Sequence, residues 1–280
     1  QKAMGDATKE NSFRSKTNGS RTSSNGVRGN HDNSSDSESK GRHVLQASVS
    51  STGSEDITIN ALKQTWGGIK AENFLGDTPI ARNCHATDIN GHLMIVFGGV
   101  HLNQRSTALN DVVIYNLEEN RWYNKQTTGT KPSKRYCHSA NVWQNKLIVF
   151  GGFDPATTLR QNDVHYLDLD HYRWIQPAIP ADTSPEPRSH HRSVVYGNKL
   201  LVFGGLSGKT MLRLNDVQLL DLESWRWSTP QTKGHAPSQR LFASLNIWRN
   251  KLVLFGGYTG NQRLNDVHLL DLGTWTWIQP

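Results

Sequence analysis

Three histidines recur at a fixed spacing, and they are the residues of this chain that could most readily do chemistry. His85, His138 and His191 follow one another at intervals of 53 residues, and a neutral imidazole can bind a metal ion or carry a proton. No closely spaced set of cysteine, histidine and carboxylate ligands accompanies them, and no activated nucleophile is recognisable. Their regular recurrence favours hydrogen-bonding roles in a repeated scaffold, with a metal site as the alternative.

Charged residues recur with the same period and suggest ion pairs. One arginine opens each of four repeats: Arg82, Arg135, Arg188 and Arg240. An Asn-Asp-Val element supplies one aspartate later in each repeat: Asp111, Asp163, Asp216 and Asp266. The matched numbers, and the need to partner any buried charge, predict that each arginine pairs with an aspartate of its own or the adjoining repeat.

The chain has two cysteines, Cys84 and Cys137, at the same place in consecutive repeats. Equivalent positions face the same way on neighbouring sheets, so we expect free thiols and a reducing compartment. The cytoplasm is the expected location, with the nucleus as the alternative. No run of residues approaches the ~20 apolar residues of a membrane span, and no membrane partner is expected.

These residues are positioned by an apolar stretch that the chain repeats four times. Each copy is rich in β-branched and aromatic residues and ends in two glycines, at residues 94–99, 147–152, 200–205 and 252–257. Such a run predicts a buried strand that stops where the backbone needs a glycine conformation or a close approach to another segment.

Each repeat has room for four short strands separated by turn residues. A strand of small or polar residues precedes the apolar strand, a third strand follows the Asn-Asp-Val element, and a fourth contains a tryptophan, at Trp122, Trp174, Trp227 and Trp277. This order predicts an all-β fold, a β-propeller built from four-stranded antiparallel blades. Each tryptophan is expected to pack between adjacent sheets.

The double glycine, the late tryptophan and the period near 50 residues resemble the kelch family, and the Arg-x-x-His and Leu-Asn-Asp-Val elements resemble its host-cell-factor-like branch. In two places the chain departs from the family pattern. Leucines (219–220 and 269–270) replace the third-strand aromatic of Tyr115 and Tyr166, and Ala243 replaces the histidine of the fourth repeat. The resemblance implies a ring of six or seven blades, so further repeats are expected in the intact protein.

The domain organisation follows from composition. Residues 1–58 are rich in serine, asparagine and glycine and poor in large apolar groups, which predicts a disordered segment. Residues 59–280 are predicted to form the kelch propeller with its four repeats, and residues near 62–72, around Trp66, resemble an outer strand without a blade of its own. An open half-ring is expected to expose sheet faces and edges.

Loops distinguish the repeats from one another, and they suggest where a partner binds. Strand direction reverses at every turn, so the loops after the double glycines and the linkers between blades emerge on one face. That face contains basic candidate residues, Arg105, Arg160, Lys209, Arg213, Arg263, Lys131 and Lys134. They predict capture of an acidic or phosphorylated peptide; a merely solubilising basic rim is the alternative.

We expect a non-enzymatic scaffold that binds another protein through this loop face, with no cofactor. One alternative is the substrate-recognition subunit of a ubiquitin ligase, although no BTB or F-box segment is recognisable. The other is a propeller enzyme, but the iron-binding spacing of nitrile-forming kelch proteins is missing, and so is a tyrosine–cysteine constellation resembling a copper radical oxidase. The net charge of +7 is spread along the chain without interleaved aromatics, so nucleic acid is not an expected partner.

Overall fold

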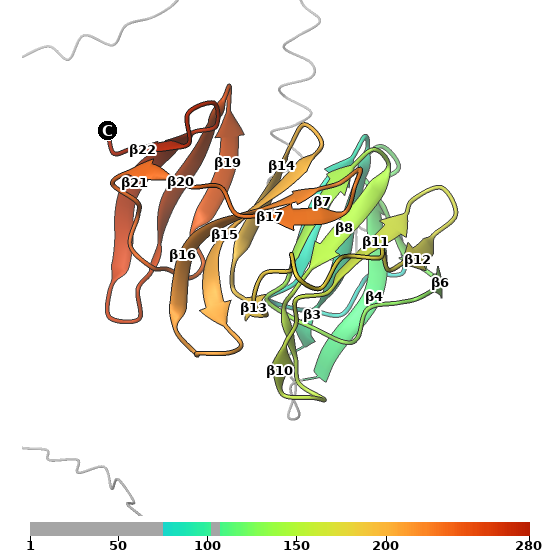
Figure 1. Ribbon diagram of the computed structural model, residues 1–280. Coiled ribbons are helices and arrows are strands. Elements are labelled where there is room, and N and C mark those ends of the chain that lie inside the picture. Colours follow the sequence, from blue (N-terminus) through green and yellow to red (C-terminus); the bar gives the residue numbers. More distant parts are fainter. Residues whose placement is uncertain (1–74, 102–106) are drawn as a thin grey trace, which may run out of the picture. The chain divides into compact units, whose positions relative to one another are not determined.

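The computed structural model describes residues 75–101 and 107–280, which form four mainly antiparallel large sheets in chain order and one separate two-stranded hairpin (Figure 1). No helix occurs in these described residues. The innermost strand of each sheet contacts the innermost strand of the next, so the sheets are the blades of the predicted propeller. The all-β prediction and the four-stranded blade are confirmed.

Blades 1 and 2 each run from an innermost strand outward to a short added strand. In that order, blade 1 contains β2 (Ala86–Asn90), β3 (Leu93–His101), β4 (Thr107–Asn116), β5 (Arg121–Lys125) and β1 (Leu75–Gly76). Blade 2 contains β7 (Ser139–Trp143), β8 (Lys146–Phe150), β11 (Val164–Asp168), β12 (Arg173–Ile175) and β6 (Thr128–Gly129). Between β8 and β11 lies a separate hairpin, β9 (Phe153–Asp154) and β10 (Leu159–Arg160).

Blades 3 and 4 repeat this plan. Blade 3 contains β14 (Arg192–Tyr196), β15 (Lys199–Ser207), β16 (Arg213–Asp221) and β17 (Arg226–Ser228), and β13 (Arg188–Ser189) pairs with the far end of β15. Blade 4 contains β19 (Ser244–Trp248), β20 (Lys251–Tyr258), β21 (Arg263–Asp271), β22 (Thr276–Ile278) and β18 (Lys233–Gly234). The two-residue strands β1, β6 and β18 pair in parallel with the outermost strand of their blade, an addition that the four-strand prediction did not include.

The apolar core lies between blades. Phe97 of blade 1 packs on Trp174 of blade 2, with 4.9 Å between ring centroids. The equivalent pair between blades 2 and 3 is Phe150 with Trp227, at 4.8 Å, and Phe203 packs on Trp277 between blades 3 and 4 at 5.8 Å. The predicted packing of tryptophans between sheets is confirmed for these three. Trp122, the fourth, is half-buried and lies against Tyr115 of its own blade.

Gly98 and Gly99 show why the glycine pair is repeated. Both have positive φ, 63° and 95°, and the register of β3 against β4 shifts at this point. A Cβ on Gly98 would lie 2.9 Å from the imidazole of His138 in the next blade, and one on Gly99 would lie 2.8 Å from the Cβ of His85. Only glycine lets this strand end approach both neighbours so closely.

The predicted ion pairs are confirmed, and they lie within single blades. Each arginine contacts the aspartate of its own repeat at 2.7–2.8 Å. Arg188 shows the arrangement: its guanidinium bonds both carboxylate oxygens of Asp216 and the carbonyl of Gly204 in blade 3. Its backbone, however, also bonds to blade 2, because its N–H donates to Gln161 and its carbonyl accepts from Gly152. The arginine therefore joins two blades.

Exposed apolar groups mark the outer face of blade 4. Phe255 occupies the position of Phe203 but is 50% exposed, because no described blade packs on it. This agrees with the expectation that an open half-ring exposes sheet faces. The predicted disordered segment 1–58, the predicted outer strand near 62–72 and the candidate Arg105 lie outside the described residues.

Candidate functional site

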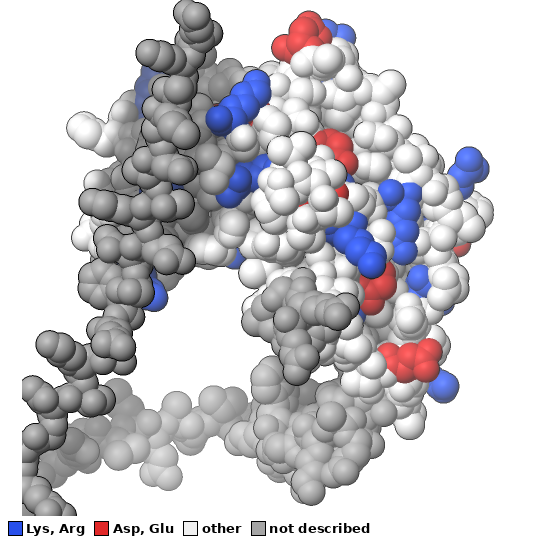
Figure 2. All heavy atoms as spheres, turned by 90° about the horizontal axis from the view of Figure 1, so that it is seen from below, with Lys and Arg blue, Asp and Glu red and all other residues white. Residues whose placement is uncertain are grey.

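The loops that follow the double glycines and the linkers between blades form one end of the propeller, which we call the loop face. It comprises residues 154–160, 207–213 and 258–263, together with the linkers 126–134, 176–187 and 229–239. Figure 2 looks from below at the lower end of Figure 1, where β10 and the turn between β15 and β16 lie. Its Lys and Arg side chains stand in separate groups on an uncharged surface with a few acidic side chains between them.

Arg213 and Arg263 are brought together around one aromatic ring. The Arg213 guanidinium lies over the ring of Tyr258, 6.0 Å from its centroid, and rests against Gly260, where a side chain would collide with it. Tyr258 and Arg263 line one cavity of about 690 Å³ together with the amide side chains of Asn261 and Gln262.

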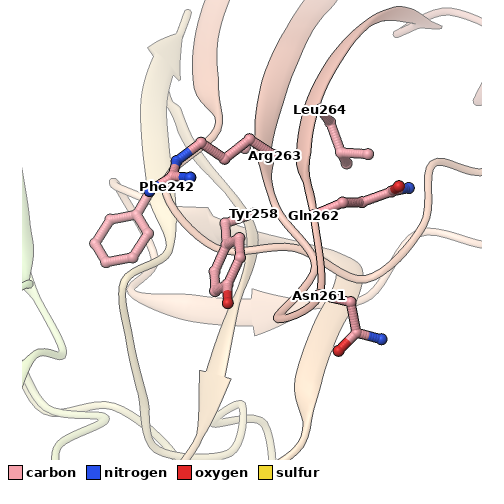
Figure 3. Close-up of a pocket in the computed structure, with 7 residues that line it drawn as sticks. Phe242, Tyr258, Asn261, Gln262, Arg263 and Leu264 are labelled. Atoms are coloured by element: carbon pink, nitrogen blue, oxygen red, sulfur yellow. The ribbon is translucent and has the colours of Figure 1, made fainter. Parts of the chain in front are cut away.

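Figure 3 shows this cavity, with the Arg263 side chain extending toward Phe242. Among the described residues, neither Arg213 nor Arg263 has an acidic partner within salt-bridge distance. Arg263, two amides and two aromatic rings therefore line one cavity, and the Arg213 guanidinium lies over one of those rings. Tyr258 and Phe242 were not predicted from the sequence, because a residue after a double glycine and one on an inner linker give no sign of sharing a cavity.

Arg160, by contrast, is used within the fold. Its Nε donates to the Ser189 hydroxyl at 3.1 Å, and one terminal nitrogen donates to the Met211 sulfur at 3.0 Å. The guanidinium also lies over Phe153, 5.7 Å from the ring centroid. The structure thus separates Arg160 from the Arg213 and Arg263 pair, although all three precede their Asn-Asp element by the same spacing.

The candidate lysines are more exposed. Lys209 lies in the turn between β15 and β16, whose first residue is Arg213, and Lys131 and Lys134 lie on the linker between blades 1 and 2. All three are exposed, and none forms an ion pair with another described residue. These three lysines belong to the loop face, but none of them lines the cavity beside Tyr258.

Two of the three histidines, His138 and His191, are buried and join blades, whereas His85 is exposed. The Nε2–H of His138 donates to the carbonyl of Phe97 in blade 1 at 3.2 Å, and Nε2 of His191 hydrogen-bonds with the Ser139 hydroxyl in blade 2 at 2.9 Å. Burial, then the nearby Arg135, lowers the pKa of His138 to about 3, and burial lowers the pKa of His191. The pKa of His85, which is less buried, shifts in the same direction for the same reason. Neutral imidazoles fixed in hydrogen bonds fit the scaffold interpretation.

No group of three or more histidine, cysteine, aspartate or glutamate side chains is arranged to hold a metal ion within residues 75–101 and 107–280. In the same residues no helix has the length and apolar character needed to cross a membrane.

The fold and repeat geometry agree with a comparison against family models. The model described as the KLHDC2/KLHL20/DRC7 Kelch-repeats domain matches residues 48–205 and 178–280. The chain belongs to this kelch-repeat family. Kelch propellers of this kind indicate a role in protein–protein interaction.

Curated relatives place the same repeats in longer proteins. Human host cell factor 2 is 32% identical over 207 residues, which cover 65% of this chain and 25% of that protein. Acyl-CoA-binding domain-containing protein 5 of Arabidopsis thaliana is 34% identical over 211 residues, covering 72% and 32%. Kelch domain-containing protein 10 of Xenopus laevis is 32% identical over 178 residues, covering 61% and 43%. The chain therefore spans less than half the length of these kelch relatives.

Two of the three acidic side chains near the kelch loop face form hydrogen bonds within the fold. Asp154 is buried and accepts a hydrogen bond from the Ala156 amide, and Glu186 accepts one from the Ser207 hydroxyl. Asp182 is exposed. On the opposite face, carboxylates such as Asp221 accept turn amides and pair with lysine. The exposed basic side chains of the loop face therefore have few local partners.

Proposed function

We propose that this kelch unit is a non-enzymatic interaction module whose loop face binds a partner protein around Arg213, Tyr258 and Arg263. The observation that carries the proposal is the pair of guanidinium groups without acidic partners among the described residues, beside one aromatic-lined cavity. Loops on a rigid scaffold commonly hold binding residues, and the blades beneath these loops are fixed by buried ion pairs.

The partner is proposed to present an acidic or phosphorylated peptide. Guanidinium groups bind carboxylates and phosphates through paired hydrogen bonds. Arginine held over an aromatic ring is already ordered, so less side-chain entropy is lost when an anion binds. The amides of Asn261 and Gln262 can donate to the peptide backbone or to remaining anion oxygens.

A peptide array tests the proposal. The purified chain is applied to immobilised peptides in which acidic, phosphorylated and neutral sequences are equally represented. We expect binding to favour the first two sets and to weaken as ionic strength rises from about 0.1 M to about 1 M, which shortens the Debye length from about 10 Å to about 3 Å. The double variant Arg213→Gln/Arg263→Gln should lose at least about tenfold in affinity, or ~1.4 kcal/mol.

The double variant Arg173→Gln/Arg226→Gln is the matched control, because both arginines are exposed at the start of an outer strand, β12 or β17, on the opposite face. It removes the same charge and should leave binding unchanged. Equal losses of affinity in both variants would mean that net charge alone explains the binding, which would contradict the proposed site. Equal binding of neutral and acidic peptides would support the solubilising-rim alternative.

A further inference from the structure

One position differs in chemistry from repeat to repeat although its backbone is repeated. It lies two residues after each of the four ion-paired arginines and is occupied by Cys84, Cys137, His190 and Phe242. All four have positive φ, between 51° and 61°, a conformation that side-chain-bearing residues adopt only when their surroundings impose it. We call these four residues the inner arc.

Backbone hydrogen bonds connect the inner arc from blade to blade. The Cys137 amide donates to the Cys84 carbonyl at 2.8 Å, His190 donates to Cys137 at 2.9 Å, and Phe242 donates to His190 at 3.2 Å. All four side chains, with His85, His138 and Arg192, line one cavity of about 220 Å³. The side chains of the inner arc therefore lie side by side, as the side chains of paired residues on adjacent strands do.

Cys84 and Cys137 are consequently direct neighbours. Segments joined by such a bond lie roughly 5 Å apart, within the ~4.4–6.8 Å range of Cα separations that a disulfide spans. Free thiols are expected from the sequence because equivalent positions face the same way on neighbouring sheets, and the convergence of the segments at the inner ends of the blades nevertheless makes these two positions neighbours. Both thiols are free in the structure.

The two thiols have different surroundings. Cys84 is exposed and Cys137 is buried. Burial, followed by the closeness of Cys84, raises the pKa of the Cys137 thiol, whereas the guanidinium groups of Arg192 and Arg160 act in the opposite direction. An exposed thiol beside a buried one is the arrangement of an attacking and a resolving cysteine.

We propose that Cys84 and Cys137 form a modification site, a dithiol that closes to an intramolecular disulfide by exchange with a small-molecule disulfide such as glutathione disulfide. The Cys84 thiolate attacks one sulfur of the small disulfide and forms a mixed disulfide, and the expelled thiolate takes up a proton. Cys137 then loses its proton and attacks the Cys84 sulfur, which expels the second small thiolate. Two protein thiols are oxidised, and one small disulfide is reduced to two thiols. The product links blades 1 and 2 beside the inner cavity.

The chain suits a direct test because it has no other cysteine. The reduced protein is equilibrated with glutathione buffers of increasing oxidation, quenched with acid, alkylated and weighed. We expect both alkylations to disappear together, a product lighter by two hydrogens, and a proteolytic peptide that joins Cys84 to Cys137. The oxidised protein should also unfold at a higher temperature than the reduced protein.

Single variants separate the two roles. Cys137→Ser should stop at a stable glutathione adduct on Cys84, and Cys84→Ser should react slowly, because its remaining thiol is buried. The double variant Cys84→Ser/His190→Cys moves the pair one step along the inner arc and should close as the wild type does, since the backbone bond there is 2.9 Å long, against 2.8 Å between Cys137 and Cys84. A wild-type product that keeps a glutathione adduct on Cys84, or that is a dimer linked between chains, overturns the proposal.

Discussion

Blades 3 and 4 carry the same side chain at the same place in opposite surroundings. Phe203 ends the apolar run of β15 and is 2% exposed, whereas Phe255 ends the run of β20 and is 50% exposed. Both precede a double glycine, and both strands make the same register shift. The difference lies outside their own sheets, because Trp277 of blade 4 covers Phe203 and no described residue covers Phe255 in the same way.

The comparison shows that burial in this fold is supplied by the next blade. Trp122 gives the complementary case at the other end of the described array: it is half-buried, while Trp174, its equivalent in blade 2, is fully buried under Phe97. A blade therefore has one face that depends on the blade before it and one that depends on the blade after it.

The largest expected effect separates the two phenylalanines. Phe203→Ala should lower the free energy of unfolding by about 3–5 kcal/mol, because it opens a cavity under Trp277. Phe255→Ala should change it by about 0.5 kcal/mol or less, as at other surface positions. Urea denaturation followed by tryptophan fluorescence measures both.

Phe203→Leu keeps the first prediction testable if the alanine variant does not fold, and it should cost less than about 1.5 kcal/mol. Equal losses at positions 203 and 255 would mean that the outer face of blade 4 is covered in solution. Repeating the measurement at several protein concentrations would then show whether a second copy of the chain is the cover.

The two phenylalanines are expected to differ between blades 3 and 4, but the ion pairs of these blades are expected to contribute equally. Each ion pair lies inside one blade, so its contribution does not depend on the next blade. Arg188→Met leaves the partly buried Asp216 carboxylate without its partner and should cost about 3–5 kcal/mol. Arg240→Met in blade 4 should cost a similar amount, since the Arg240 and Asp266 side chains are no more exposed than the Arg188 and Asp216 pair. The measurement is again urea denaturation.

Removing both partners sharpens this result. Arg188→Met/Asp216→Leu should be more stable than Arg188→Met alone, because no charge then remains buried without a partner. A much smaller loss of stability for Arg240→Met than for Arg188→Met would contradict the idea that these pairs act within single blades. It would mean that the contribution of an ion pair depends on the next blade packing on its sheet.

The sequence predicted the repeated frame well because each blade uses the same residues for the same contacts. The arginine and aspartate pairs and the tryptophans between sheets could be identified by counting equivalents, and the structure places them as expected. What could not be identified was any feature created where blades meet. The contact of Arg213 with Tyr258 and the contact between Cys84 and Cys137 each combine residues of different blades, whose separation depends on how the sheets converge.

Arg160 illustrates the same limit within the loop face. Its sequence position is equivalent to those of Arg213 and Arg263, but Ser189 and Met211 occupy its guanidinium. Both of those partners lie on segments whose placement is set by blade 3. Equivalent arginines therefore differ in their contacts, and the repeat pattern alone does not identify the residues that make those contacts.

Acid should act unequally on the blade interfaces, and this is the smallest expected effect. His138 and His191 join blades 1 to 2 and 2 to 3, while Ala243 takes their place between blades 3 and 4. Burial holds the folded-state pKa of His138 at about 3, below the unfolded value of about 6.5. The unfolded chain therefore binds more protons below pH ~6.5, and stability falls on acidification by up to about 1.4 kcal/mol per pH unit for each such histidine.

Hydrogen exchange between about pH 7 and about pH 5 resolves this by blade, once the intrinsic pH dependence is removed. Amides of β8 and β15 should lose protection as the pH falls, while those of β22 should lose less, because carboxylates such as Asp266, with a pKa lowered to about 2 by Arg240, stay ionised throughout this range. His138→Gln, which retains a donor toward the Phe97 carbonyl, should flatten the response of β8 and leave that of β15 in place. A uniform loss across all four blades would instead mean that acid unfolds the described array as one cooperative unit, and that the interfaces are not independently stable.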